Sequence, residues 1–408
     1  ENTSHKTVTL VETTISERRE FYQKMVTIAL PVVFQSLLTN SLSFVDTVMI
    51  GQLGESSIAA VALGNQMFFL ISVLFFGVSS GSAIFLSQYW GAKNETNIQR
   101  VLGLSFALAG TGALLFALAS LFMPRQIMHI FTTESEVVNQ GIAYLRIVGI
   151  SYLFTAISQI LATALRVIGY AKIPLQVALF SLTLNAGGNY LLIFGIGPFP
   201  ELGVAGAAIA TTISRLVEVL ALLWIVYHHH PVIAIKNRDA FRWNKTFLMH
   251  IIPTSLPVII NEFFWALGMA TYKVAYSKMG IEAIASINVA ESVGNLFFVL
   301  MMGVSNASLI MIGVKIGEKQ RHLALLYAKR FITTALLVGL AMGVFEFLFA
   351  PLFTSFFNIS ERVRQMAIYC LSINAVLLPI KSINMVIIVG VLRSGGDTKY
   401  SMFAEMFG

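Results

Sequence analysis

The sequence predicts an all-α integral membrane protein built from two homologous halves. Hydrophobic residues make up 56% of the 408 residues and charged residues only 12%, whereas soluble domains carry about 25% charged residues. The mean hydropathy is +0.78. Residues 29–99 align with residues 255–325 at a constant shift of 226 positions and without a gap. The low charge places most of the chain in a bilayer, and the long repeat indicates a duplicated domain.

The repeat is carried mainly by small residues and by one Leu-Arg motif. Two homologous halves in an apolar chain are typical of secondary transporters, whose halves move around a central site. The aligned pairs are Gly54 with Gly280, Gly77-Val78-Ser79 with Gly303-Val304-Ser305, Gly91 with Gly317, and, at a shift of 227, Leu165-Arg166-x-x-Gly169 with Leu392-Arg393-x-x-Gly396.

Apolar segments of the chain approach the length of about 20 residues that a membrane-spanning helix needs. They are 26–50, 61–88, 101–123, 138–161, 174–195, 204–228, 247–270, 284–312, 328–350, 364–391 and one that starts at residue 400. If segments 1–6 correspond to segments 7–12, we expect about one and a half further helices after residue 408. The expected organisation is a cytoplasmic tail (1–25), a six-helix bundle (26–228), a cytoplasmic linker (229–246) and a second, C-terminally incomplete bundle (247–408).

Basic residues predict the orientation of these helices. The N-terminal tail and every second connection hold 19 of the 27 Lys and Arg residues, whereas the opposite connections hold only Arg125, Lys278, Arg362 and Arg364. Because basic loops stay in the cytoplasm, the tail and the 229–246 linker are expected there. The net charge of +7 is explained by these loops, so no nucleic-acid partner is expected.

Signatures of soluble enzymes are missing from the sequence. A phosphate-binding Gly-x-x-x-x-Gly-Lys-[Ser/Thr] loop, a Cys/His zinc pattern and a nucleophile elbow do not occur. The only cysteine, Cys370, excludes an intramolecular disulfide and is interpreted as a small apolar filler. We therefore expect neither an enzyme nor a bound cofactor.

Asp46 is the most informative ionisable residue inside an apolar segment, because such residues are costly in a bilayer and mark function. It lies about five residues from the outer end of segment 1, which places it within about 10 Å of the outer interface. Asn185 and Asn189, four residues apart on segment 5, and Thr211 on segment 6 fall at the same depth. Their oxygens suit Na+ or a hydrogen-bonded proton site. The alternative is a buried Asp that the amides hold as a helix–helix contact.

A second candidate site lies in the second half, at Glu262 in the middle of segment 7. Trp265 and two phenylalanines follow it, and a carboxylate beside aromatic rings suits a lipophilic organic cation. The alternative is an ion pair with Lys273 or Lys381. Glu291 either lines the central cavity or caps the outer end of segment 8.

Other charged residues in the apolar segments have simpler interpretations. Arg215 and Glu218 are three residues apart and are expected to form a local ion pair. Glu346 is expected at the outer interface. Lys381 lies in segment 10, where it would repel a cationic substrate unless it is paired, and Arg146 can reach the interface or pair.

Several motifs together resemble the MATE (multidrug and toxic compound extrusion) transporters, and in particular their NorM-like bacterial branch. The resemblance spans residues 20–405. It implies twelve helices in two six-helix bundles. It also implies antiport, in which a cationic or amphipathic drug leaves the cell as Na+ or H+ enters. The motifs are Ala29-Leu30-Pro31, Phe44-Val45-Asp46-Thr47-Val48-Met49-Ile50-Gly51, Gln88-Tyr89-Trp90-Gly91-Ala92, the 202–211 segment that begins Leu202-Gly203-Val204-Ala205-Gly206, and Leu392-Arg393-x-x-Gly396-Asp397-Thr398.

The resemblance assigns roles residue by residue. Asp46 matches the carboxylate of the first lobe, Asn185 and Asn189 match its cation-site positions, and Glu262 matches the Glu of segment 7. The acid that NorM-like members carry in segment 10 is replaced by Ser382. We therefore expect the coupling-ion site (Na+, with H+ as the alternative) at Asp46, Asn185, Asn189 and Thr211, and the substrate site at Glu262, Trp265 and Glu291.

These assignments predict a monomeric, multi-pass protein of the bacterial inner membrane. Its partners would be the lipid bilayer and small organic cations or drugs. The alternative function is a flippase for lipid-linked precursors, which would need a cationic cavity. Lys273, Lys381, Arg146 and Arg215 keep that alternative open.

Overall fold

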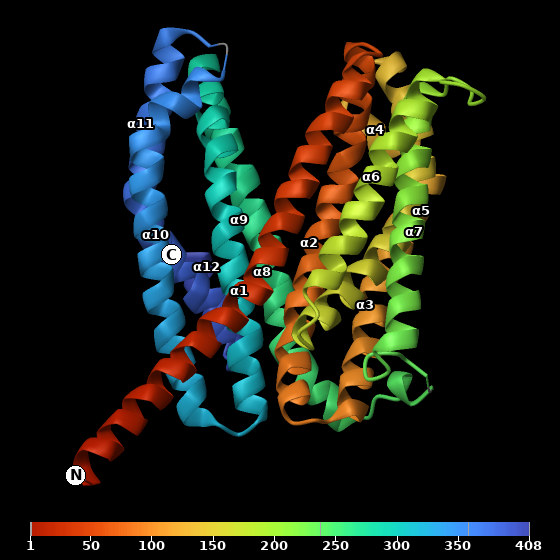
Figure 1. Ribbon diagram of the computed structural model, residues 1–408. Coiled ribbons are helices and arrows are strands. Elements are labelled where there is room, and N and C mark those ends of the chain that lie inside the picture. Colours follow the sequence, from red (N-terminus) through yellow and green to blue (C-terminus); the bar gives the residue numbers. More distant parts are fainter. Residues whose placement is uncertain (1, 237, 358, 408) are drawn as a thin grey trace. The chain divides into compact units, whose positions relative to one another are not determined.

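The structure, a computed structural model, describes residues 2–236, 238–357 and 359–407. These residues are almost entirely helical, and they contain no strand (Figure 1). The helices are α1 (Asn2–Gly51), α2 (Glu55–Gly91), α3 (Glu95–Phe122), α4 (Pro124–Phe131), α5 (Ser135–Val167), α6 (Lys172–Phe194), α7 (Gly203–His229), the 3₁₀ helix η1 (Arg238–Phe241), α8 (Lys245–Ser277), α9 (Ile281–Gly317), α10 (Arg321–Ser355), α11 (Glu361–Met385), its π-helical continuation η2 (Val386–Leu392) and α12 (Thr398–Phe407).

The predicted membrane segments correspond one by one to these helices. Within the described residues, ten helices are long and apolar enough to span a bilayer. The eleventh segment is the start of α12, and the short helix α4 between α3 and α5 was not anticipated. The expected tail is continuous with the first spanning helix. Its Phe21 is fully buried and packs edge-on against Tyr327 and Phe331 of α10, with ring centroids 4.9 Å apart in each pair.

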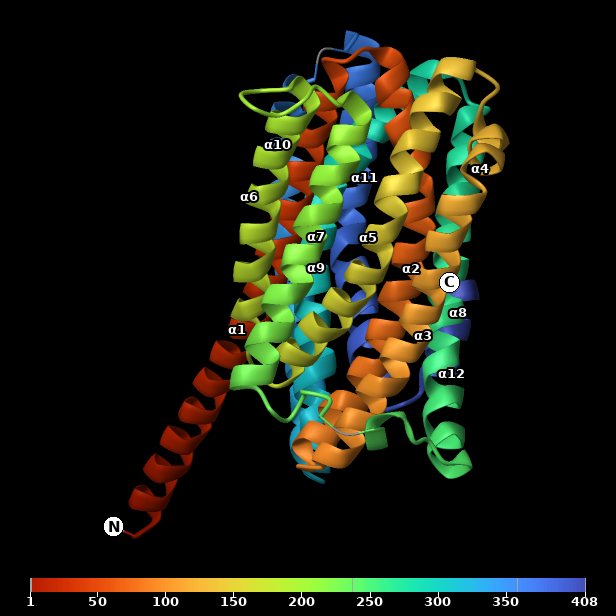
Figure 2. The same cartoon turned by 90° about the vertical axis from the view of Figure 1, so that its right-hand side faces the viewer.

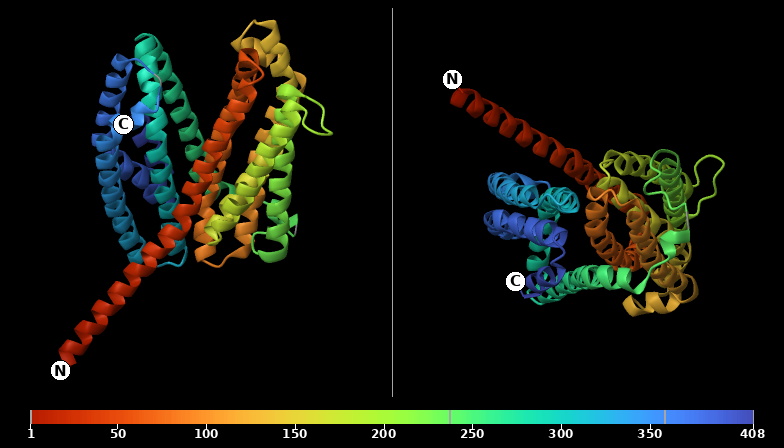
Figure 3. Two further views of the ribbon diagram at one scale, coloured as in Figure 1. Left: turned by 45° about the horizontal axis from the view of Figure 1, so that its top comes forward. Right: turned by 90° about the horizontal axis from the view of Figure 1, so that it is seen from below.

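Contacts divide the chain into two compact units, which are described separately. Unit 2 holds residues 34–270 and 396–408, and therefore the last part of α1, all of α2–α7, most of α8 and α12. Within it, α5 lies between α7 and α2, α6 packs on α7, and α3 packs on both α2 and α5 (Figure 2). Seen end-on, these helices gather into one bundle (Figure 3).

Unit 1 holds the chain up to Val33 and residues 271–395. Its helices α9, α10 and α11 pack on one another in all three pairings, and η2 packs against α9. The core between them is apolar; its buried residues are Val293, Phe297, Met301, Met342, Ala350, Leu371 and Leu378.

The unit boundary falls inside α1 and inside α8, not in the 229–246 linker. The first part of α1 therefore packs with helices of the second half of the chain, and the first part of α8 packs with helices of the first half. The lobe boundaries expected from the repeat remain a prediction.

Glycines allow the first part of α8 to pack closely on α2 and the first part of α1 to pack closely on α9. A Cβ on Gly77 of α2 would lie 2.9 Å from Ile259 Cα of α8, and a Cβ on Gly303 of α9 would lie 2.5 Å from Val33 Cγ2 of α1. Gly77 and Gly303 are equivalent in the repeat, and so are Val33 and Ile259. The small-residue runs seen in the sequence thus serve the same close helix packing in both halves.

The backbone repeats as the sequence does. Gly54 and Gly280, which precede α2 and α9, have φ angles of 112° and 104°. Lys93 and Lys319, also 226 positions apart, are left-handed residues with φ of 54° and 61° in the turns after α2 and α9. Equivalent turns with the same rare backbone conformation support the duplicated-domain interpretation.

Candidate functional site

The structure brings together all four residues predicted to bind the coupling ion, within unit 2. Asn189 Nδ2 donates to Asp46 Oδ1 at 2.7 Å. With the Asn185 amide turned so that both of its ends are satisfied, its nitrogen donates to Asp46 Oδ2 at 3.2 Å and its oxygen accepts from Thr211 Oγ1 at 3.2 Å. Helices α1, α6 and α7 thus converge on one carboxylate.

Helix geometry explains why these residues meet. Asp46 lies five residues before the end of α1, and Asn189 lies five residues before the end of α6. Asn185 is one turn further along α6 on the same face. Thr211 lies eight residues into α7, which runs back beside α6. Equal depth on packed helices, with α1 and α6 running in one direction and α7 in the other, therefore predicts the cluster.

The cluster leaves one oxygen free. Asn189 is 1% exposed, and its Oδ1 accepts no hydrogen bond from any described residue. A buried acceptor without a donor is costly unless a cation or a proton donor reaches it. The Asp46 carboxylate, this amide oxygen and the Thr211 hydroxyl are hard-oxygen groups of the kind that bind Na+ or hold a proton, and their role as a coupling-ion site remains a prediction. In the described part of the chain, no group of three or more His, Cys, Asp or Glu side chains could hold a metal ion.

Two further groups influence Asp46 that the sequence analysis did not place there. Arg215 of α7 is close enough to interact electrostatically with the Asp46 carboxylate, and it forms the predicted ion pair with Glu218 at 2.7 Å. Tyr144 of α5 is also within electrostatic range of Asp46, and its hydroxyl donates to Asn65 Oδ1 of α2 at 2.8 Å. Neither Tyr144 nor Asn65 is charged, so the search for ionisable residues in apolar segments could not find them.

The predicted substrate residues fall in different units. Glu262 is buried on α8 in unit 2, and Trp265, three residues further on, is 39% exposed. Glu291 lies half-buried on α9 in unit 1. The roles assigned to these three residues remain predictions.

The residue next to Glu262 takes part in a contact that the sequence did not suggest. Asn261 Nδ2 donates to Glu405 Oε2 of α12 at 2.5 Å. The equivalent position in the first half is Gln35, whose Oε1 accepts from Arg166 Nη2 at 2.9 Å. In both halves this position bonds a charged side chain from another helix, although the partners differ.

Glu346 is not interfacial, contrary to the expectation. It is 0% exposed and both of its carboxylate oxygens accept from Asn374 Nδ2 of α11, at 2.9 and 3.1 Å. Asn374 Oδ1 in turn accepts from Lys381 Nζ at 2.6 Å. The expectation considered only distance from the helix end, whereas the face of α10 that carries Glu346 points into the three-helix core of unit 1.

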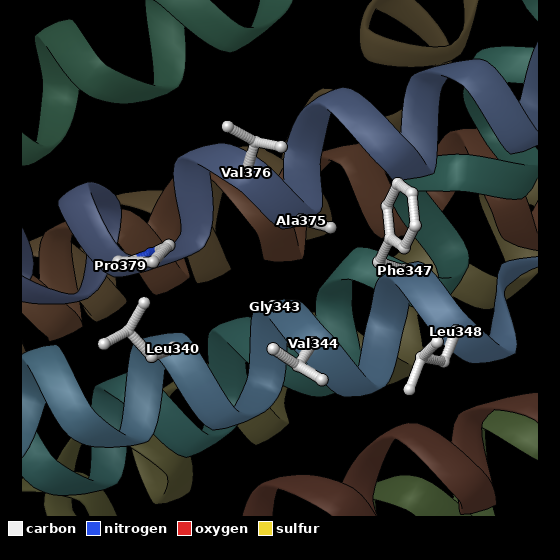
Figure 4. Close-up of a pocket in the computed structure, with 8 residues that line it drawn as sticks. All are labelled: Leu340, Gly343, Val344, Phe347, Leu348, Ala375, Val376 and Pro379. Atoms are coloured by element: carbon white, nitrogen blue, oxygen red, sulfur yellow. The ribbon is translucent and has the colours of Figure 1, made fainter.

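The same two helices form an apolar groove of about 390 Å³ on another face (Figure 4). Leu340, Val344 and Phe347 of α10 lie across from Val376 and Pro379 of α11. At 100° per residue, Val376 and Pro379 are on the opposite side of α11 from Asn374 and Lys381. Because its lining is apolar and largely exposed, this groove is suited to acyl chains and offers no group for an ion.

Comparison with known proteins agrees with the fold and the motifs. The sequence model of the MatE family matches residues 31–191 and 257–408. The uncharacterized transporter YisQ of Bacillus subtilis (strain 168) is 25% identical over 378 residues, which are 92% of this chain and 82% of that protein. The probable multidrug resistance protein NorM of Thermotoga maritima is 26% identical over 332 residues, 81% of this chain and 71% of that protein.

Solved structures of MATE transporters share the fold. A MATE in the bent conformation superposes with a TM-score of 0.85 at 20% identity, over 95% of this chain and 85% of that chain. A MOP superfamily transporter from Pyrococcus furiosus gives a TM-score of 0.82 at 22% identity, over 94% and 85% of the two chains. The matched family model, the relatives and the helical architecture together show that the chain belongs to the MatE family of membrane transporters.

Proposed function

We propose that this protein exports cationic or amphipathic organic compounds across the bacterial inner membrane in exchange for Na+ or H+. The supporting observation is the Asp46 cluster, in which one carboxylate and two buried amides meet near the C-terminal ends of α1 and α6. The relatives named as probable multidrug resistance proteins support the efflux of drugs.

The chemistry of antiport follows from the cost of an unpaired charge. Asp46 carries a negative charge in a spanning helix, and the amides stabilise that charge without neutralising it. A coupling cation or proton neutralises it, and the site then no longer attracts an organic cation. Ion binding and drug binding therefore oppose each other, which is the coupling that exchange requires.

The first helix is suited to transmit this change. Pro31 lies within α1, where it removes one helix hydrogen bond, and the helix passes from unit 1 to unit 2 two residues later. In our proposal, neutralisation of Asp46 bends or releases α1 and favours drug exit.

The test is Asp46→Asn, measured as efflux of ethidium from cells that contain the protein in their membrane. We expect the variant to lose efflux, because a neutral amide neither takes up a proton nor attracts a cation as a carboxylate does. The matched control is Asp239→Asn, which removes an exposed linker carboxylate paired with Arg242. Normal ethidium efflux by Asp46→Asn would refute the role of Asp46. Dissipating the Na+ gradient and the pH gradient one at a time identifies the coupling ion.

A flippase for lipid-linked precursors is less well supported. It would need free cations to hold a pyrophosphate, yet Arg215 is paired with Glu218 and Lys381 is bonded to Asn374. Transport of ethidium into proteoliposomes under an imposed ion gradient distinguishes the two functions.

A further inference from the structure

Unit 1 contains a polar path that runs from the surface of α11 into the middle of its three-helix core. Lys381 is exposed, Asn374 is half-buried, and Glu346 is fully buried. Asn374 and Lys381 are seven residues apart on α11 and therefore share a face. The three side chains are linked in the order Lys381, Asn374, Glu346 by the hydrogen bonds given above.

The Asn374 amide is oriented by charge at both ends. Its oxygen faces the ammonium of Lys381 at 2.6 Å, and its NH2 group faces the two carboxylate oxygens of Glu346. Hydrogen bonds to ionised groups are the strong ones. A carboxylate and an ammonium are each costly in a spanning helix, and this network lets one compensate the other through the amide.

The surroundings leave the amide accessible. The core residues around it are apolar, and a Cβ added at Gly294 of α9 would lie 3.7 Å from Asn374 Nδ2. Lys381 lies 20 residues into the helix that begins at Glu361. Ionisable side chains inside spanning helices almost always face the bundle interior or a water-filled cavity, and not lipid. Because Lys381 is exposed, we expect an ion to reach this place from water.

We propose that Asn374 and Glu346 form a binding site for the ammonium group of an organic cation, and that Lys381 occupies this site for most of the time when no such cation is bound. The side chain of lysine is an alkylammonium on a flexible stem. Its seating on Asn374 Oδ1 shows which chemical group the site accepts. The buried Glu346 carboxylate supplies the charge that favours a cation.

Lys381 then acts as a tethered competitor of the transported cation. The apparent affinity of a ligand is its intrinsic affinity multiplied by the fraction of time that the site is open. If Lys381 occupies the site about nine-tenths of the time, its removal strengthens ligand binding about ten-fold. This inference rests on the proposed export of organic cations, and it specifies a primary or secondary ammonium as a favoured head group.

Equilibrium binding to the purified full chain tests the proposal. The probe is dansylcadaverine, a fluorescent primary alkylammonium, and the matched ligand is its N-acetylated, uncharged derivative. We expect Lys381→Met to bind dansylcadaverine about ten-fold more tightly than the parent protein. Lys381→Arg keeps a tethered cation and is expected to bind as weakly as the parent. Lys329→Met, which removes an exposed lysine at the start of α10, is the matched control and should change nothing.

Glu346 supplies the second arm of the test. In the Lys381→Met background, Glu346→Gln should abolish the gain, and neither variant should alter binding of the uncharged derivative. If Lys381→Met binds no better than the parent, or if the gain survives Glu346→Gln, the proposal is wrong and the network is a structural ion pair.

Chemical rescue covers the case of an unstable variant. Lys381→Ala removes the alkylammonium, and n-butylammonium carries the same head group on a chain one carbon longer than the missing part. We expect n-butylammonium to raise the melting temperature of Lys381→Ala but not that of the parent or of Lys381→Arg. Failure of the amine to stabilise Lys381→Ala, or to permit its recovery, overturns the proposal.

These outcomes are separate from the test of the proposed function. If the parent protein shows no ion-driven efflux, the proposed function fails even if the binding pattern is found. If Asp46→Asn loses efflux while Lys381→Met binds no more tightly, only the second site fails.

Discussion

Asn189 contributes two different atoms to the surroundings of Asp46. Its amide nitrogen donates to the carboxylate at 2.7 Å, and its buried oxygen has no donor among the described residues. The first atom stabilises the charged form of Asp46, and in the proposed ion site the second is available to coordinate an incoming ion. One side chain would thus serve the site both with and without the ion.

Asn189→Leu removes both atoms while keeping a similar volume. Loss of the Nδ2 donor destabilises the ionised Asp46 carboxylate by about 1.5–3 kcal/mol, the usual contribution of a hydrogen bond to a charged group, and so favours proton binding. If H+ is the coupling ion, we therefore expect the H+ concentration for half-maximal ethidium efflux to fall at least about ten-fold, since 1.4 kcal/mol corresponds to a factor of about ten, measured in proteoliposomes with a graded ion gradient. If Na+ is the coupling ion, loss of the Oδ1 ligand is expected to raise the half-maximal Na+ concentration instead.

Thr183→Val is the control for this prediction. Thr183 lies on the same helix, and its hydroxyl bonds only the Leu179 carbonyl of that helix, at 2.8 Å. Its loss should leave the ion dependence unchanged. An unchanged half-maximal concentration for Asn189→Leu would exclude the amide from the ion site.

At the scale of elements, the close packing of α8 on α2 depends on a glycine. Gly77 of α2 allows the backbone of α8 to approach so closely that a Cβ would meet Ile259 Cα at 2.9 Å. No side-chain rotation relieves a clash with backbone. The two helices would have to move apart, and packing along their whole contact would loosen.

Gly77→Ala is therefore expected to destabilise the protein by about 1–3 kcal/mol, the usual cost of overpacking. Gly110→Ala on α3 is the matched control, because no atom lies within 4 Å of a Cβ added there. Alanine at an open helix position is better than glycine by up to about 1 kcal/mol. The measurement is thermal unfolding in detergent. A melting temperature for Gly77→Ala at or above that of Gly110→Ala would contradict the close approach.

At the scale of the whole molecule, the distribution of Lys and Arg predicts which ends of the helices face the cytoplasm. The 229–246 linker belongs to the basic set, and the α8–α9 turn belongs to the opposite set. The single native cysteine makes this testable, because Cys370→Ala gives a background without thiols.

In that background, Lys236→Cys and Lys278→Cys each place one exposed thiol on a connection. We expect a membrane-impermeant maleimide to label Lys278→Cys in intact spheroplasts and Lys236→Cys only after permeabilisation. The reverse pattern would invert the whole orientation and would place Asp46 near the cytoplasmic face.

The sequence by itself determined the number, order and approximate ends of the spanning helices. It could do so because a helix must be about 20 apolar residues long to cross a bilayer and because charge is excluded from that length. It also determined the repeat, which reappears as matched φ angles at Gly54 and Gly280. The Asp46 cluster was predictable because residues at one depth on neighbouring helices can meet, and depth can be counted along a sequence.

Only the tertiary structure decided which face of each helix is buried and which helix that face contacts. Glu346 was placed correctly near one end of its helix and wrongly at an interface, because its depth gives no information about its direction. The link from Glu346 through Asn374 to Lys381 joins two helices, and its charges balance only when those helices pack. The tertiary structure also decided where the first parts of α1 and α8 pack. The repeat predicts that these two equivalent segments pack alike, but it does not predict which half of the chain each one contacts.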